Sequence, residues 1–299
     1  MYNRSFVRLK ENTYKWIFTI LAFASLVFLI GIILTLLKES LPVFVKVKMT
    51  SFLLGQNWYP TATPPDFGIW PLIVASFVVT AGAMVVCVPI GIGTALFIHE
   101  LASYRQRALL KPIIEILAGI PSIVYGFFGM VIVAPFLQNL LGISTGLCAF
   151  TASLVLGIMA TPTVASLAED ALSFVPRSFR EASLALGANR WQTLTRVVLP
   201  AAGSGISTAI ILGLGRAVGE TMTVLMVAGG AAMVPKSIFD PVRPMTATIA
   251  AEMGEAVLGS LHYHALFAIG LILFLITLGV NICAEIISRR YRLKLGLGR

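Results

Sequence analysis

Long apolar segments separated by shorter polar ones make up most of this sequence. A helix that crosses a bilayer needs about 20 consecutive, mostly apolar residues. Six segments meet this requirement: residues 16–37, 70–98, 113–137, 147–167, 206–227 and 266–287. The pattern therefore predicts an all-α polytopic membrane protein with six transmembrane helices. Residues 1–15 are expected to form an N-terminal segment, and residues 16–299 a single transmembrane domain.

The composition agrees with a membrane protein. Hydrophobic residues make up 58% of the chain and charged residues only 12%, with a mean hydropathy of +0.92. In a soluble domain, about 25% of the residues are charged. Cys87, Cys148 and Cys283 all lie in apolar segments and show neither a metal-ligand spacing nor a disulfide framework. Redox chemistry and a metal site therefore find no support in the sequence.

The 22 Lys and Arg residues are distributed unevenly among the polar segments. Four precede the first span, three lie between the second and third, four between the fourth and fifth, and five follow the sixth, whereas only five lie on the opposite side. Because Lys and Arg accumulate on the cytoplasmic side, this count predicts that both termini are cytoplasmic. The net charge of +9 is therefore interpreted as an orientation signal, and a nucleic-acid partner is not expected.

The cytoplasmic segment between the fourth and fifth spans, residues 173–200, is predicted to form two short helices. Pro176 suits the first turn of a helix, and Gly187 tolerates the left-handed conformation that often ends one. Asn189 followed by Gln192 matches a capping box that opens the second helix. Pro200 then ends the segment. One face of the first helix carries Phe179, Ala182, Ser183 and Leu186.

The spacing within this segment resembles the EAA loop of ABC importer permeases. That loop reads Glu-Ala-Ala, three residues, Gly, nine residues, and Ile-x-Leu-Pro. The matching residues here are Glu181-Ala182-Ser183, then Gly187, then Val197-Val198-Leu199-Pro200. Ser183 in place of Ala and Val197 in place of Ile are mild departures. The resemblance implies that the first helix docks in a groove of an ATPase subunit, and that coupling to the ATPase involves Arg180, Glu181, Ala182, Ser183, Gly187, Leu199 and Pro200.

An amphipathic helix that lies at the membrane interface, anchored by Trp191, is the alternative interpretation of this segment. The fixed spacing favours docking to an ATPase. The sequence contains no G-x-x-x-x-G-K-[ST] phosphate loop. The chain is therefore expected to be a transport subunit with no catalytic site and no cofactor of its own. ATP and Mg²⁺ are expected in the partner ATPase.

The fifth predicted span contains two ionisable residues, Arg216 and Glu220. Such residues usually face the bundle interior or a water-filled path, because contact with lipid is costly. The two are four positions apart, so they are expected to share a helix face and to be able to pair. An arginine stays charged and offers several donors to an oxyanion, and Thr221 adds a hydroxyl. Gly215 and Gly219 are expected to permit close helix approach.

These residues leave two roles open. A substrate pathway formed by Arg216, Glu220 and Thr221 is one, and a structural ion pair that joins two helices is the other. Nothing in the sequence decides whether Glu220 holds the arginine in place or acts as a gate.

Three further segments resemble phosphate-importer permeases, within the type I ABC importer family. They are residues 118–129 (AGIPSIVYGFFG), 213–224 (GLGRAVGETMTV) and 237–256 (SIFDPVRPMTATIAAEMGEA). The last is closer to the PstC-type subunit than to its PstA-type partner. Together with the EAA-like loop, the similarity covers nearly the whole chain from about residue 15. In that family the arginine and glutamate of this segment are implicated in transport, and they match Arg216 and Glu220.

The resemblance implies a permease subunit that moves inorganic phosphate from an extracytoplasmic binding protein into the cytoplasm. It implies a multi-pass protein of a bacterial or archaeal cytoplasmic membrane, paired with a PstA-type permease and two PstB-type ATPase subunits. One alternative is a permease for another oxyanion, such as sulfate or molybdate, which would share the EAA-like loop. The other is an ion-gradient transporter without an ATPase, against which the loop spacing argues.

Two long segments on the outer side, residues 38–69 and 228–265, leave two interpretations open. They form either a docking surface for an extracytoplasmic protein or a cap on the helix bundle. Trp58 and its neighbouring prolines predict an ordered, aromatic-anchored connection in the first segment. His262 and His264 lack partners with a metal-ligand spacing and are interpreted as interfacial polar residues.

Overall fold

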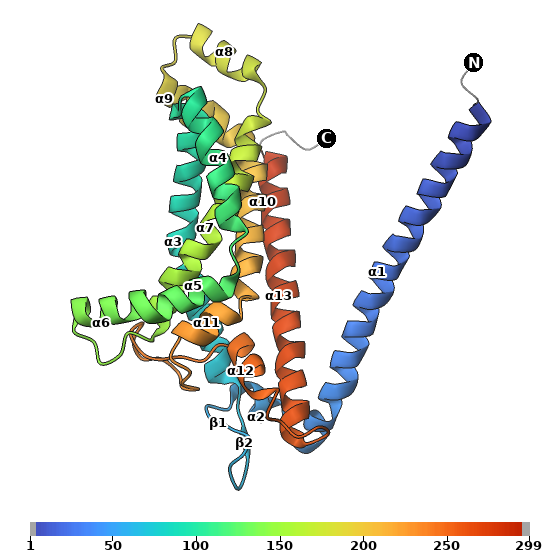
Figure 1. The fold of residues 1–299 in the computed structure, drawn as a ribbon, viewed down its shortest axis with the longest axis vertical. Helices are drawn as coiled ribbons and strands as arrows, with labels where there is room; N and C mark the ends of the chain where they lie inside the picture. The colour runs from blue at the N-terminus through green and yellow to red at the C-terminus, as the bar shows by residue number, and fades with distance from the viewer. Residues whose placement is uncertain (1–3, 295–299) are drawn as a thin grey trace.

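The computed structural model describes residues 4–294, and its regular elements are helices apart from one short β-ribbon and an isolated β-bridge between Gly229 and Val242 (Figure 1). The α-helices are α1 (Arg4–Lys46), α2 (Met49–Leu54), α3 (Trp70–Leu96), α4 (Tyr104–Ala118), α5 (Ser122–Phe128), α6 (Ala134–Leu141), α7 (Ala149–Ser173), α8 (Arg177–Ala185), α9 (Arg190–Thr193), α10 (Leu199–Val218), α11 (Met222–Val227), α12 (Met245–Glu252) and α13 (Leu261–Lys294). Three π-helical segments adjoin them: η1 (Phe97–Leu101), η2 (Gly129–Val133) and η3 (Leu194–Val198). The strands β1 (Trp58–Tyr59) and β2 (Asp66–Phe67) pair antiparallel. Residues 1–3 of the predicted N-terminal segment, and Arg299 among the basic residues counted above, lie outside the described residues.

Six helical segments within residues 4–294 are long and apolar enough to cross a membrane. They are Thr13–Lys46, Trp70–Leu101, Ser122–Leu141, Ala149–Ser173, Arg190–Val218 and Leu261–Ile286. The predicted number of spans is therefore confirmed. Most of these helices extend past the predicted limits, because hydropathy marks the apolar core of a span and not the ends of its helix.

The predicted third span, residues 113–137, is wrong as a continuous helix. Pro121 has no N–H to donate and disfavours the helical conformation at Ile120. Accordingly, α4 ends at Ala118, and α5 begins at Ser122. In Figure 1, α5 and α6 run across the bundle, whereas α4 lies along α7, which it contacts.

The predicted fifth span, residues 206–227, is also broken. Helix α10 ends at Val218 with Gly219 as its C-cap, and α11 begins at Met222. The two breaks, at residues 119–121 and 219–221, lie in segments that resemble phosphate-importer permeases. The apolar character of these segments suggested continuous spans, but Pro121 and Gly219 end the helices.

Glycines allow α3, α7 and α10 to pack closely. A Cβ built at Gly157 of α7 would lie only 2.9 Å from the carbonyl oxygen of Ala83 and 2.8 Å from the Cβ of Val86, both on α3. A Cβ at Gly213 of α10 would lie 2.5 Å from a methyl group of Val164 on α7. Because lipid tails are as apolar as side chains, membrane helices associate mainly through such close packing.

The close approach predicted at Gly215 and Gly219 occurs at other glycines. A Cβ at Gly215 would come no nearer than 3.8 Å to Asn281, and one at Gly219 would meet only its own helix. The tight contacts of α10 are instead made by Gly205 and Gly213. The spacing of small residues therefore indicated a closely packed helix but not which face makes the contact.

Helix α1 leans away from the other helices and meets α13 near the C-terminal end of α1 (Figure 1). None of its most apolar 18-residue window is buried inside the chain. A helix that is apolar on all sides, yet exposed in an isolated chain, is typical of a membrane span. Its outward side chains suit contact with lipid.

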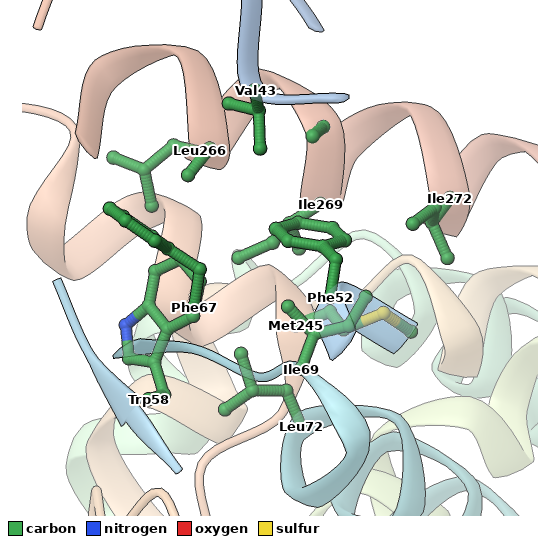
Figure 2. Packing of buried hydrophobic residues seen from close by; sticks show 12 residues of the cluster. Val43, Phe52, Trp58, Phe67, Ile69, Leu72, Met245, Leu266, Ile269 and Ile272 are labelled. Atoms are coloured by element: carbon green, nitrogen blue, oxygen red, sulfur yellow. The ribbon is translucent and has the colours of Figure 1, made fainter. Parts of the chain in front are cut away.

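A hydrophobic core closes the end of the bundle opposite α8 and α9 (Figures 1 and 2). Its largest members come from α1, α2, the β-ribbon, α3, α12 and α13: Val43, Phe52, Trp58, Phe67, Ile69, Leu72, Met245, Leu266, Ile269 and Ile272. The Trp58 indole N–H also donates to the Glu252 carboxylate at 3.0 Å. The segment 38–69 is thus ordered and aromatic-anchored, as predicted.

The start of α1, the end of α13 and the α8–α9 segment all lie toward the same end of the molecule (Figure 1). The β-ribbon and α12 lie at the other end. This arrangement agrees with an even number of crossings, in which both termini share a side with the α8–α9 segment.

We expect Gly157→Ala to lower the thermal stability of the detergent-solubilised chain. The added methyl group must displace the backbone of α3, and such overpacking typically costs about 1–3 kcal/mol. Gly93→Ala is the matched control, because it also lies in a helix and a Cβ there meets nothing within 4 Å. The measurement is the temperature at which half of each purified variant aggregates. Equal midpoints for the two variants would contradict the packing argument.

Candidate functional site

Helix α8 begins and ends where the sequence predicts. Pro176 is its N-cap, and Leu186 its C-cap. Gly187 follows with φ of +85°, a left-handed conformation that side chains other than glycine rarely adopt. The predicted bounds of the first helix in the 173–200 segment are therefore confirmed.

The second helix also opens as predicted. The Asn189 side chain accepts a hydrogen bond from the Gln192 amide at 2.8 Å, and the Gln192 side chain accepts one from the Asn189 amide at 2.9 Å. Helix α9 then continues through η3 into α10 without an extended residue between them. The expectation that Pro200 separates a loop from a new span is wrong, because Pro200 lies in the first turn of α10, where it fits a continuing helix.

The predicted face of α8 borders an open hollow of about 560 Å³ between α8 and η3. Its lining includes Phe179, Ala182, Ser183, Leu186, Gly187 and Val197. Glu181 is exposed beside it. Ser183 also contacts the Thr193 hydroxyl, with 3.0 Å between the two oxygens, and so ties α8 to α9. The hollow is open to solvent, mostly apolar, and rests on two linked helices.

Arg180 does not share this face. Its Nη2 lies 2.8 Å from Nε2 of His99 and 2.7 Å from Oε1 of Glu100, both in η1. The sequence placed Arg180 with the ATPase-coupling residues. The structure places Ala182, Ser183 and Gly187 along the hollow, leaves Glu181 exposed outside its lining, and turns Arg180 inward, toward the end of α3.

Arg216 binds partners on two other helices. Its Nη1 donates to the Thr163 hydroxyl on α7 at 2.9 Å, and both terminal nitrogens lie 3.4–3.5 Å from the carbonyl oxygen of Ala118. That carbonyl ends α4, where the partial negative charge of a helix C-terminus favours a cation. These bonds occupy only part of the five N–H donors of the guanidinium. The side chain is half-buried, so donors remain for an anion.

The expected pairing of Arg216 with Glu220 is wrong. Helix α10 ends at Val218, so the rule that residues four apart share a face no longer applies at position 220. The Glu220 carboxylate instead accepts a hydrogen bond from the backbone amide of Thr223 at 3.1 Å. Within the described chain, Arg216 and Glu220 form no ion pair with each other.

Threonine hydroxyls bond carbonyl oxygens beside both helix breaks. Thr223 donates to the carbonyl oxygen of Ser122 at 2.9 Å, which connects α11 to α5. Thr246 on α12 donates to the carbonyl oxygen of Glu220 at 2.8 Å. Thr221, predicted to line the pathway, bonds only locally, to the carbonyl oxygen of Gly219 at 3.3 Å.

Sequence reasoning missed Thr163 and the polar cluster around Glu169. For Thr163, the only signal was a hydroxyl residue next to Pro162 in an apolar segment, and that signal is weak. The acidic pair Glu169-Asp170 at the end of a span gave a stronger signal for the second, because acidic side chains there need partners.

No three His, Cys, Asp or Glu side chains in the described part of the chain gather into a metal-binding group. His262 lies 2.9 Å from the Glu252 carboxylate, and His264 lies 2.8 Å from the carbonyl oxygen of Glu39. Both histidines therefore connect elements near the hydrophobic core of Figure 2.

Comparison with known proteins is consistent with this architecture. The family model described as "Binding-protein-dependent transport system inner membrane component" matches residues 87–293. The Probable ABC transporter permease protein YqgH of Bacillus subtilis is 39% identical over 231 residues, covering 77% of this chain and 75% of that protein. The Phosphate transport system permease protein PstC of Mesorhizobium japonicum is 37% identical over 246 residues, covering 76% and 74%, respectively. PstC of Pasteurella multocida is 36% identical over 265 residues, covering 82% of each chain.

Solved structures show the same fold at lower identity. A bacterial alginate ABC transporter, in complex with an alginate pentasaccharide-bound periplasmic protein, matches 94% of this chain and 96% of its own, with a TM-score of 0.64 and 15% identity. The inward-facing MetNI methionine ABC transporter matches 75% of this chain and 94% of its own, with a TM-score of 0.56 and 23% identity. This chain therefore belongs to the family of inner-membrane components of binding-protein-dependent transport systems, the permease subunits of ABC importers, and is a multi-pass protein of the cytoplasmic membrane.

Proposed function

We propose that this chain is a permease subunit of an ATP-driven importer of inorganic phosphate. The observation that carries this proposal is its similarity to relatives named PstC, which extends over about three quarters of the chain or more. The family model, which matches residues 87–293, spans both helix breaks and Arg216.

The α8 hollow supports the proposed docking position of the ATPase subunit. An apolar, solvent-open face on a short helix is typical of a docking surface for another protein. In the proposal, an ATPase subunit occupies this hollow, and ATP with Mg²⁺ binds in that subunit. The α8–α9 segment and both termini then face the cytoplasm, as the Lys and Arg count predicts.

The remaining partners follow from the proposed class. A PstA-type permease completes the pathway, and two PstB-type subunits supply ATP hydrolysis. A phosphate-binding protein docks at the opposite end, near the β-ribbon and α12. This chain has no catalytic step of its own in the proposal.

Arg216 is proposed to lower the electrostatic cost of moving an anion through the bundle. An isolated phosphate in a low-dielectric region is strongly disfavoured, and a fixed positive charge offsets part of that cost. The contacts with Thr163 and Ala118 hold the guanidinium at the meeting point of α4, α7 and α10. Glu220 is proposed to stabilise the break after α10, which keeps that position fixed.

We expect Gly187→Arg to abolish phosphate uptake while the protein remains in the membrane. The arginine would project from the lining of the α8 hollow and block the ATPase. Gly187→Ala is the matched control. Alanine carries the same left-handed backbone strain, about 1–2 kcal/mol, and a Cβ there meets nothing within 4 Å. The measurement is uptake of radiolabelled phosphate, together with the amount of ATPase that co-purifies. Equal uptake by the two variants would refute docking at this face.

We expect Arg216→Gln to lower the initial rate of phosphate uptake at least about tenfold at limiting phosphate, because a charge-assisted hydrogen bond is worth about 1.5–3 kcal/mol. Arg216→Lys keeps the positive charge and should retain more uptake. Initial rates in cells that lack their own phosphate importers provide the measurement. If Arg216→Gln takes up phosphate at the wild-type initial rate and at equal membrane abundance, Arg216 only stabilises the packing of the helices.

We expect excess sulfate or molybdate to leave the uptake of labelled phosphate unchanged. A permease for either of those anions would show strong competition instead. The assay uses the same cells, with the competing anion at about a hundredfold excess, where a one-site competitor of equal affinity would occupy nearly every site. ATP-dependent uptake of labelled sulfate in place of phosphate would retain the importer and reject the substrate.

A further inference from the structure

A cluster of polar side chains joins α8 to three other helices at the end of the bundle where α8 and α9 lie. The residues that form it are His99 of η1, Arg107 and Lys111 of α4, Glu169 and Ser173 of α7, and Arg180 of α8. They come from positions up to 81 residues apart. The cluster is separate from the α8 hollow and from Arg216.

Glu169 lies at the centre of the cluster, with only 2% of its side chain exposed. Arg107 donates to its Oε1, Lys111 lies 2.7 Å from its Oε2, and Ser173 donates to Oε1 at 3.0 Å. The pKa of Lys111 is raised mainly by its hydrogen bond to Asp170 and then by its hydrogen bond to Glu169, so its ammonium group stays charged. Burying a carboxylate without such partners would be costly. The arrangement therefore fixes the start of α4 to the end of α7.

His99 connects this buried carboxylate to α8. Its side chain is 8% exposed, and its Nε2 lies 2.8 Å from Nη2 of Arg180. An arginine can only donate, so Nε2 accepts and carries no proton. The proton of the neutral ring is then on Nδ1, which lies 3.4 Å from the Glu169 carboxylate and 3.3 Å from the Ser173 hydroxyl. This tautomer follows from the partners of each nitrogen.

Arg180 connects α8 to η1, which residues 174–176, the direct chain connection between α7 and α8, do not reach. The three residues 174–176 already join α7 to α8. Arg180 adds a link to η1, the π-helical end of α3, through both His99 and Glu100. π-Helical turns are often found at functional sites. Through His99 and Glu169, α8 is thereby connected to α3, α4 and α7 together.

We propose that His99 is a positioning residue that makes α3, α4 and α7 follow α8 when the ATPase moves it. This inference rests on the proposed function, because α8 moves only if an ATPase docks there. Without the His99 link, α8 still binds the ATPase through its outer face. The ion pair between Arg180 and Glu100 still links α8 to η1, but the path from α8 through His99 to Glu169, and so to α4 and α7, is lost. ATP hydrolysis would continue while transport per ATP falls.

The test uses the whole importer, with its partner permease, ATPase subunits and binding protein, in proteoliposomes. Phosphate uptake and ATP hydrolysis are measured in the same vesicles. We expect His99→Ala to lower the phosphate moved per ATP about tenfold, the ratio that corresponds to about 1.4 kcal/mol. ATPase co-purification and hydrolysis should stay within about twofold of wild type. Arg180→Gln, which also removes the ion pair with Glu100, should give at least that loss, and the double variant no more loss than Arg180→Gln, because residues that act as one unit are not additive.

Arg177→Gln is the matched control, since it removes the same charge from an exposed position of α8 and should leave the ratio unchanged. Arg180→Gln, which alters a helix at the surface, keeps the test decisive if His99→Ala does not fold. A wild-type ratio in Arg180→Gln with the ATPase bound would overturn the proposal. So would loss of the ATPase from His99→Ala, because His99 would then serve docking. If no ATPase co-purifies with the wild-type chain, the proposed function itself fails.

Discussion

The structure depends on one constraint: backbone groups freed inside an apolar bundle must find partners within the protein. The chain interrupts two helices, after Ala118 and after Val218. The carbonyl oxygens at these breaks are bonded by side chains of other elements, Arg216 to Ala118 and Thr223 to Ser122. Side chains beside the second break therefore stabilise the first, and the cation of the candidate pathway takes part in that stabilisation.

The same constraint governs the charged residues. Arg216 lies where α4 presents a helix C-terminus, and Glu169 lies among the donors of α4 and α7. The partners of Arg216 lie on other helices, and Glu169 combines donors of α4 with Ser173 of its own helix. Because each is bound by separate elements, a shift of one helix changes the surroundings of the charge. A transporter that must alternate between states can use such contacts, since they re-form only in particular arrangements.

The two faces of helix α8 have different surroundings. Its outer face, with Ala182, Ser183 and Gly187, borders the open hollow, and Arg180 faces inward to His99. The family-level resemblance treated these residues as one coupling group. Their separation in space assigns the proposed docking and the proposed transmission to different residues, so that a variant is expected to lose one and keep the other.

The sequence by itself determined the number of spans, the position of α8 and α9, and the presence of a cation in the bundle. These features depend on hydropathy and on caps such as Asn189–Gln192, where the partners are three residues apart. Pro121 and Gly219 mark the helix breaks locally, but only the tertiary structure decided which glycines pack and what Arg216 binds. Arg216 meets Thr163 and Ala118 from 53 and 98 residues away. A periodic pattern places a residue on a face, but which helix lies against that face depends on the packing of the whole chain.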